Sequence, residues 1–479
     1  MRIRPSEKAA VAVVFVASIF MSALDTTIVN VALPDIGRSF SVTPTAVDGI
    51  SIGYMVSLAV FMPASGWLGD RFGGKRVLLT ATVIFTIASA LCGLASSVGE
   101  LDAFRVLQGI GGGMMAPVGM AMLFRVFPQE ERMRVTAILT VPTALAPAAG
   151  PVLGGLLVSE LSWRWVFFVN LPAGVATVVF GALFLRHDPQ HSPGDFDLAG
   201  FVLAGTGLGL LMYGVSEGPN SGWGSPIILG CVVAGGILLV VMVKVELRSA
   251  APMVAVRVLG NRLFRNGTMA LVLMTAAFLG TLYAMSLYLQ DGKGLGALAS
   301  GLTIFPEAVG VSAGSMLASR VLYPRLGPRR HTAVGLINIA VAIGLLALLS
   351  PGASLWWTRL FMFFVGVGMG QVMLATQTAS FATISAKATG RASTLFQAVR
   401  QVGGAAGVAL LTTVIALAGP TRLVNGHLAA NLTAYRLALG AAAVCCLAGL
   451  PFAFAIRDSD AAATIPVRPR KTAVPGRPT

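Results

Sequence analysis

Residues 9–33 read AAVAVVFVASIFMSALDTTIVNVAL, an apolar run in which Asp25 is the only charged side chain. The hydrocarbon core of a bilayer is about 30 Å thick, and an α-helix needs about 20 apolar residues to cross it. The run is therefore long enough to span a membrane. Similar runs recur along the whole chain, and we count fourteen of them.

The composition supports the same class. Of 479 residues, 56% are hydrophobic and 11% are charged, whereas about 25% are charged in an ordinary soluble domain. So few charges exclude a soluble enzyme, a nucleic-acid-binding domain and a disordered polymer. The net charge of +15 fits basic residues that gather in cytoplasmic loops rather than an acidic partner.

The basic residues also fix the orientation. With fourteen spans, the two termini and the loops on their side carry 26 Lys and Arg, and the opposite loops carry four. Because Lys and Arg accumulate in cytoplasmic loops, this asymmetry places both termini in the cytoplasm.

An internal repeat divides the chain. Four pairs of positions share an offset of 254 residues: Gly73 and Gly327, Arg105 and Arg359, Gly112 and Gly366, Gly150 and Gly404. We predict a six-helix bundle over 9–186, two inserted helices over 197–247, a second six-helix bundle over 263–457 and a disordered tail over 458–479. Repeated bundles in one membrane chain are typical of secondary transporters, which handle substrate between the halves. The fold class is therefore an all-α polytopic membrane protein.

Charged residues inside the spans need a reason, because each costs about 2.5–3.5 kcal/mol at a helix centre. Asp25 either exchanges protons or pairs with a cationic substrate in a central cavity, or it hydrogen-bonds a neighbouring helix near the outer end. Glu307, in the tenth span, is a second candidate proton carrier, or else a structural partner of Arg400 or Arg359. Arg105 cannot lose its proton, so it either biases the protonation of a nearby carboxylate or forms a structural ion pair.

Polar and small residues at helical spacing predict the substrate cavity. Arg105 begins a stripe that continues through Gln108 and Gly112, and Arg400 belongs to a similar stripe with Gln397. The small residues allow a close approach of a helix or a substrate. Our candidate cavity residues are Asn30, Gln108, Gly112, Gln397 and Arg400.

The fifth span combines prolines with small residues. Gly150 and Gly154 form a GxxxG face next to Pro151 and Gly155. Such a face permits tight packing, and the prolines bend the helix. We expect either a bending interface between the halves or a merely kinked scaffold helix.

The connection between spans two and three, GWLGDRFGGKR at 66–76, is dense in charge. Its basic residues could serve topology alone, but Asp70 does not fit that role. Asp70 could face a helix N-terminus or a basic group of the other half, and so latch one conformation. The candidate latch residues are Gly66, Asp70, Arg71, Gly73, Lys75 and Arg76.

Other chemistry is not indicated. His187 and His191 are separated by Pro189, so a continuous helix cannot present both to a metal, and we expect no metal site. We find no catalytic triad, phosphate-binding loop or ATP-binding domain, and hence predict no enzyme and no cofactor. The energy would then come from an ion gradient.

At these residues the chain resembles the fourteen-helix drug:proton antiporters of the major facilitator superfamily. Residues 24–34 (LDTTIVNVALP) match that branch's first-helix motif. Residues 66–76 match the superfamily's loop motif, with Gly69 for the usual alanine and Gly74 for a basic residue. Residues 105–111 (RVLQGIG) are similar to the fourth-helix motif associated with proton coupling.

The resemblance extends to about residue 457. Residues 150–155 (GPVLGG) resemble the antiporter motif of the fifth helix, with Ala146 in place of its usual earlier glycine, and residues 390–393 and 400–404 resemble motifs of helices twelve to thirteen. The resemblance implies proton-driven export of small amphipathic compounds across a bacterial cytoplasmic membrane. Glu307 belongs to no motif that we can match.

We therefore expect a monomeric, multi-pass antiporter of the cytoplasmic membrane that moves protons inward and antibiotics, drugs or biocides outward. Its partners would be the substrate, protons and the bilayer, without nucleic acid. The main alternative is a dedicated exporter of a single natural product or lipid-like metabolite. An uptake symporter or a membrane sensor fits less well, because of the fifth-span motif and the lack of a soluble signalling domain.

Overall fold

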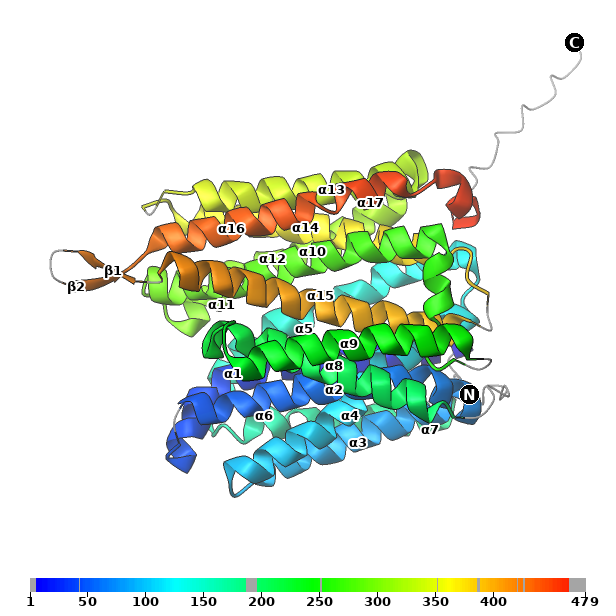
Figure 1. Ribbon diagram of the computed structural model, residues 1–479, viewed down its shortest axis with the longest axis horizontal. Coiled ribbons are helices and arrows are strands. Elements are labelled where there is room, and N and C mark those ends of the chain that lie inside the picture. Colours follow the sequence, from blue (N-terminus) through cyan, green and yellow to red (C-terminus); the bar gives the residue numbers. More distant parts are fainter. Residues whose placement is uncertain are drawn as a thin grey trace, which may run out of the picture.

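The computed structural model describes residues 6–42, 44–186, 196–249, 252–350, 352–385, 388–419, 421–424 and 427–464. Long helices run in nearly the same direction and form one bundle, and the described part of the chain begins and ends at the same end of it (Figure 1). We call this end cytoplasmic, following the distribution of basic residues.

The first half forms the blue-to-cyan part of Figure 1. Its helices are α1 (Glu7–Phe40), α2 (Pro44–Phe72), α3 (Gly74–Leu94), α4 (Val98–Val126), α5 (Gln129–Glu160), α6 (Trp165–Phe168) and α7 (Asn170–Phe184). Helix α4 packs against α1, α2 and α3, and α1 also contacts α5 and α7. Ser6 and Ser97 begin α1 and α4 by accepting backbone N–H groups at the N-cap, where such donors lack partners within the helix.

The second half lies on the opposite side of the molecule (Figure 1). Its elements are α10 (Arg262–Leu287), η2 (Tyr288–Gly292), α11 (Ala297–Ile304), α12 (Pro306–Leu317), η3 (Ala318–Leu322), α13 (Tyr323–Leu348), α14 (Leu355–Ser380), α15 (Thr389–Ala418), α16 (Leu432–Leu447) and α17 (Leu450–Ala455). Helix α14 packs against α10, α12 and α13, and α15 packs against α10 and α16. The limits that we set between the domains stay predictions.

The inserted helices α8 (Leu198–Ser221) and α9 (Pro226–Arg248) pack against each other, and the short helix η1 (Val256–Gly260) follows them. Helix α8 also contacts α2 of the first half and α15 of the second. Beyond the end of α8, Trp223 Nε1 donates a hydrogen bond of 2.7 Å to Thr413 Oγ1 of α15. The inserted pair therefore touches both halves.

The number of spans differs from our count of fourteen. Among the described residues, thirteen helical segments are long and apolar enough to cross a membrane. One of them covers 51 residues, Leu298–Leu348. Gly327 interrupts this segment with φ 70° and ψ 168°, which is not a helical conformation. Fourteen spans result only if this segment is divided at Gly327.

Three further segments differ from expectation. Helix α2 continues to Phe72, so Gly66, Asp70 and Arg71 lie on a helix. Only Gly73 (φ 85°) separates α2 from α3.

Strands β1 (Thr421–Val424) and β2 (His427–Ala430) form an antiparallel hairpin within the chain that we predicted to be all helical.

The tail that we predicted to be disordered from 458 begins with a 3-10 helix, η4 (Asp458–Thr464), because it packs against the bundle. The tail after Thr464 lies outside the described residues. His187 and His191 lie outside them as well.

Candidate functional site

The centre of the first half contains a buried ion pair. Asp25 of α1 is 0% exposed and Arg105 of α4 is 1% exposed. Arg105 Nη1 lies 2.5 Å from Asp25 Oδ2. Burying either charge alone would be expensive, and each needs the other and further hydrogen bonds to offset the loss of water.

Two amide side chains complete the coordination of the Asp25 carboxylate. Gln108 Nε2 donates to Asp25 Oδ1 at 2.9 Å, and Asn170 Nδ2 of α7 donates to the same oxygen at 3.1 Å. Gln108 Oε1 also accepts from Arg105 Nη1 at 2.6 Å. Three donors therefore hold the carboxylate, and they come from two helices other than its own.

Asn170 is a site residue that our sequence analysis missed. Its amide also donates to Ser89 Oγ at 3.1 Å, and Ser89 in turn donates to the carbonyl of Phe167 at 2.9 Å. The available signal was that Asn170 is the only Asn or Gln in the apolar segment Trp165–Phe184.

The remaining surroundings of Arg105 are aromatic and backbone groups. Its Nε donates to the carbonyl of Ile50 at 3.2 Å. The guanidinium carbon lies 4.1 Å from the centre of the Tyr54 ring and 5.9 Å from that of Phe167, where the ring electrons attract a cation. Arg105 is thus held from three sides, and its orientation toward Asp25 is fixed.

The predicted cavity residues divide into separate environments. Gln108 belongs to the ion-pair network and is 0% exposed, with both ends of its amide bonded in this conformation, and its role in a substrate cavity stays a prediction. Asn30 is exposed and accepts a hydrogen bond of 3.0 Å from Ser51. A Cβ at Gly112 would lie 3.0 Å from Tyr54 Oη, so this glycine leaves room for the Tyr54 ring.

Glu307 lies in the first turn of α12 and is 6% exposed. In the described part of the chain, no ion pair includes it. Arg400 instead donates to Gln397 Oε1 at 2.9 Å, and Arg359 stacks on Trp356 at 4.8 Å. The interpretation of Glu307 as a partner of either arginine is therefore wrong. A second buried carboxyl group stays available for a proton.

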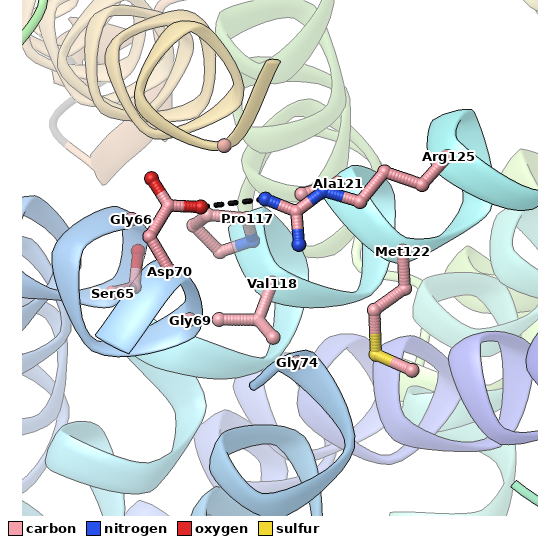
Figure 2. Close-up of a pocket in the computed structure, with 11 residues that line it drawn as sticks. Ser65, Gly66, Gly69, Asp70, Gly74, Pro117, Val118, Ala121, Met122 and Arg125 are labelled. Atoms are coloured by element: carbon pink, nitrogen blue, oxygen red, sulfur yellow. Dashed lines mark hydrogen bonds and ion pairs between the residues drawn. The ribbon is translucent and has the colours of Figure 1, made fainter. Parts of the chain in front are cut away.

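At the cytoplasmic side, Asp70 connects the two halves. Figure 2 shows its carboxylate pointing toward Arg125 of α4, and Oδ1 lies 2.5 Å from Arg125 Nη2. Its other oxygen lies 3.8 Å from Nε of Arg391, in the first turn of α15. Asp70 therefore faces both a helix N-terminus and a basic group of the other half.

Close packing accompanies this ion pair. Ser65 Oγ lies 3.1 Å from Thr394 Oγ1 of α15. A Cβ at Gly66 would lie 2.9 Å from Thr394 Oγ1 and 3.2 Å from Arg391 Cα. Gly66 therefore lets α2 approach α15 closely. We call the contact of Asp70, Gly66 and Ser65 with Arg391 and Thr394 the first gate.

The other candidate latch residues do not join the halves in this conformation. Arg71 and Arg76 are exposed. Lys75 Nζ donates to the carbonyls of Ala182 and Leu185 at 2.9 and 2.6 Å, both at the end of α7. Lys75 therefore connects α3 with the end of α7 by hydrogen bonds within the first half.

The glycines of α5 face α1. A Cβ at Gly150 would overlap Thr27, and one at Gly154 would lie 3.1 Å from the carbonyl of Ile28. Gly155 has nothing within 4 Å of its Cβ position among the described residues, whereas Pro151 lies near Gly301 of α11. Helix α5 thus packs closely on α1 with one face and contacts the second half with another.

The described residues hold no group of three or more His, Cys, Asp or Glu that could bind a metal. A proton that joins Asp25 removes the negative member of the buried pair. Arg105 would then keep only Gln108, the Ile50 carbonyl and the aromatic rings as partners.

Comparisons with known proteins agree with this architecture. The family model described as Major Facilitator Superfamily matches residues 15–408. The multidrug resistance protein B homolog of Mycobacterium tuberculosis is 31% identical over 408 residues, which cover 82% of this chain and 74% of that protein. The tetracenomycin C resistance and export protein of Streptomyces glaucescens is 32% identical over 399 residues, covering 83% and 74%.

Two further likenesses support the assignment. A putative multidrug resistance protein MdtD of Cronobacter sakazakii is 32% identical over 409 residues, covering 84% of this chain and 85% of that protein. The crystal structure of the human organic anion transporter MFSD10 (TETRAN) superposes with a TM-score of 0.67 at 16% identity, covering 94% of this chain and all of that one. The chain is a multi-pass membrane protein and belongs to the major facilitator superfamily of transporters.

Proposed function

We propose that this protein is a proton-driven antiporter that exports lipophilic or amphipathic small molecules across the cytoplasmic membrane by alternating access. The observation that carries the proposal is the fully buried Asp25–Arg105 pair, with Gln108 and Asn170 on the same carboxylate. A carboxylate buried in a membrane bundle is costly to keep charged, and such groups commonly serve as proton relays.

The proposed cycle exchanges one proton at Asp25 for each passage of substrate. A proton from the outside joins a carboxylate oxygen of Asp25 and cancels its charge, so that Arg105 loses its ionic partner. The freed guanidinium favours a different arrangement of α1 and α4. When the site opens to the cytoplasm, the proton leaves Asp25 and the ion pair forms again.

The energy of one proton is sufficient for this task. A membrane potential of about 150 mV supplies about 3.5 kcal/mol for each proton. Because about 1.36 kcal/mol corresponds to a factor of ten, a neutral substrate could be held at a gradient of a few hundredfold. We expect no cofactor and a monomeric protein, since each step uses groups of one chain.

The names of the relatives favour drug or antibiotic export. A dedicated exporter of one natural product is the second candidate, and the relative named for tetracenomycin C export favours it. The scarcity of acidic groups points the same way, because Asp25 and Glu307 are the carboxylates that we expect within the spans, and Asp25 is already paired.

Inside-out membrane vesicles test the proposal. Vesicles with an acidic lumen and a fluorescent pH probe would receive ethidium as a lipophilic cation, chloramphenicol as a neutral compound, or tetracenomycin C. A transported compound should release protons from the lumen in vesicles that contain the protein and not in matched vesicles without it. Uptake that persists unchanged after the gradient is collapsed would contradict proton coupling. A response to tetracenomycin C alone would favour the dedicated exporter.

A further inference from the structure

The short helix η4 at the end of the described chain packs beneath the second half. Asp458 Oδ1 accepts the backbone N–H of Arg329 at 2.9 Å, and Tyr323 Oη lies 2.7 Å from Thr464 Oγ1. Ala461 is fully buried, in a cluster with Ile456, Leu263, Ala379 and Ala382. This segment is therefore held at both of its ends and in the middle.

Asp458 occupies a special position on α13. The backbone at Gly327 has φ 70°, and a Cβ there would lie 2.8 Å from Asp458 Cγ. The helical residues that follow Gly327 begin with Pro328, so the N–H of Arg329 lies in their first turn, where it lacks a partner within the helix. Asp458 supplies that partner and places a negative charge where the helix dipole favours it.

The internal repeat shows what this carboxylate replaces. At the offset of 254, Gly73 corresponds to Gly327, and both have positive φ. Asp70 of the first gate, however, corresponds to Pro324. Its partner Arg125 corresponds to Ala379, against which Ile456 and Ala461 pack. The second half thus lacks both members of the Asp70–Arg125 pair, and the tail lies at their place.

At the equivalent place, the second half also contacts a helix of the first half. Helix α15, which meets Asp70, corresponds to α5, and Arg391 corresponds to Ala137. Ala137 packs against Tyr323, Leu374 and Ala375 of the second half. Helix η4 contacts α5 as well as α13 and α14. The tail therefore adjoins the junction that is equivalent to the first gate.

We propose that residues 458–464 form a second cytoplasmic gate, in which Asp458 is the positioning residue. The segment lies where the second half lacks an equivalent of the Asp70–Arg125 pair, and it stabilises the conformation in which the two halves meet at the cytoplasm. This inference rests on the proposed function only in its assumption of alternating access.

Labelling of a cysteine at the junction tests the second gate. Ala137, which is 2% exposed, is changed to Cys in the full chain, and inside-out vesicles are treated with a membrane-impermeant maleimide. Parent protein without this cysteine gives the background from the four native cysteines. We expect Asp458→Ala, and a chain ending at Arg457, to raise the labelling rate by about fivefold, because the closed conformation loses population.

Asp460→Ala is the matched control. Asp460 lies on the same short helix but is exposed, so its substitution should leave the rate unchanged. Asp458→Asn keeps an oxygen that can accept from Arg329, and it should restore slow labelling if the variants are folded. Equal rates in the Ala137→Cys protein, in the same protein with Asp458→Ala and in its shortened form would overturn the proposal, as would equal increases from Asp458→Ala and Asp460→Ala.

The labelling is performed without substrate and without a proton gradient. A second gate would therefore be detected even if the protein proved not to be a proton antiporter. Conversely, proton-coupled transport with labelling that does not respond to Asp458→Ala would leave the proposed function standing and remove the second gate.

Discussion

The two halves share an architecture but not a chemistry. At the offset of 254, Arg105 corresponds to Arg359 and Asp25 corresponds to Leu279. Arg105 is buried against Asp25, whereas Arg359 is partly exposed and stacks on Trp356 at 4.8 Å. The repeat has thus kept the position of the arginine and lost its partner.

The cytoplasmic gates show the same asymmetry. The first half closes on the second with the carboxylate of Asp70 between Arg125 and Arg391. At the equivalent place in the second half, the carboxylate comes from Asp458 in the tail, and the other contacts are the Tyr323–Thr464 hydroxyl pair and an apolar cluster. The comparison teaches that a duplicated fold preserves close helix packing, while each half has its own arrangement of charge.

The largest expected difference between the halves concerns the two arginines. Arg105→Ala leaves Asp25 buried without its ionic partner, which should destabilise the protein by about 3–5 kcal/mol and abolish coupled transport. Arg359→Ala, the matched change in the second half, should cost less than about 1 kcal/mol. Thermal unfolding in detergent and efflux from cells measure both. Equal effects of the two substitutions would refute the asymmetry.

The first gate should control turnover more than binding. Asp70→Ala removes the carboxylate shared by Arg125 and Arg391, and we expect kcat to fall about tenfold because conformational steps limit many such cycles. The affinity for substrate should change little. Transport kinetics in vesicles separate the two quantities, and a loss confined to affinity would contradict the role of Asp70 as a latch.

Asn170 should have an intermediate effect. Asn170→Ala removes one of three donors to Asp25 and leaves Ser89 without its amide partner, at a cost of about 1–3 kcal/mol. Coupled efflux should be weakened and not abolished, since Arg105 and Gln108 still hold the carboxylate. Efflux assays at matched protein levels measure this, with Thr177→Ala on the same helix as a control. Full activity of the Asn170 variant would limit the network to α1 and α4.

The smallest effect is expected for Glu307. Glu307→Gln keeps the shape of the side chain and removes its ability to exchange a proton. Because the proposed cycle moves one proton at Asp25, the number of protons released per substrate should change little, and a fall by about half would show that Glu307 carries a second proton. Simultaneous measurement of substrate binding and pH in detergent gives this ratio. An unchanged ratio would leave Asp25 as the sole carrier among the two candidates.

Much of the fold could be predicted from the sequence, because apolar length and the placement of basic residues have direct physical causes in a membrane. The repeat paired Gly327 with Gly73, and both glycines have positive φ, 70° and 85°. The number of spans was less certain, since the structure presents Leu298–Leu348 as one segment.

The site was predictable only in part. The cost of a charge in lipid pointed to Asp25 and Arg105, but their contact depends on how α1 meets α4, which a single sequence does not state. Asn170 joins the pair from α7, a helix far from both in the chain. Likewise, the order of the tail at 458–464 depends on tertiary contacts with Arg329 and Tyr323, and composition alone suggested disorder.

The most direct test of the account is proton release from the purified protein when substrate is added, comparing the wild type with Asp25→Asn. Leu279→Asn, at the equivalent position of the second half, is the control for placing an amide in a membrane helix. We predict release from the wild type and the control, and none from Asp25→Asn. Undiminished release from Asp25→Asn would contradict the central claim that Asp25 carries the coupled proton.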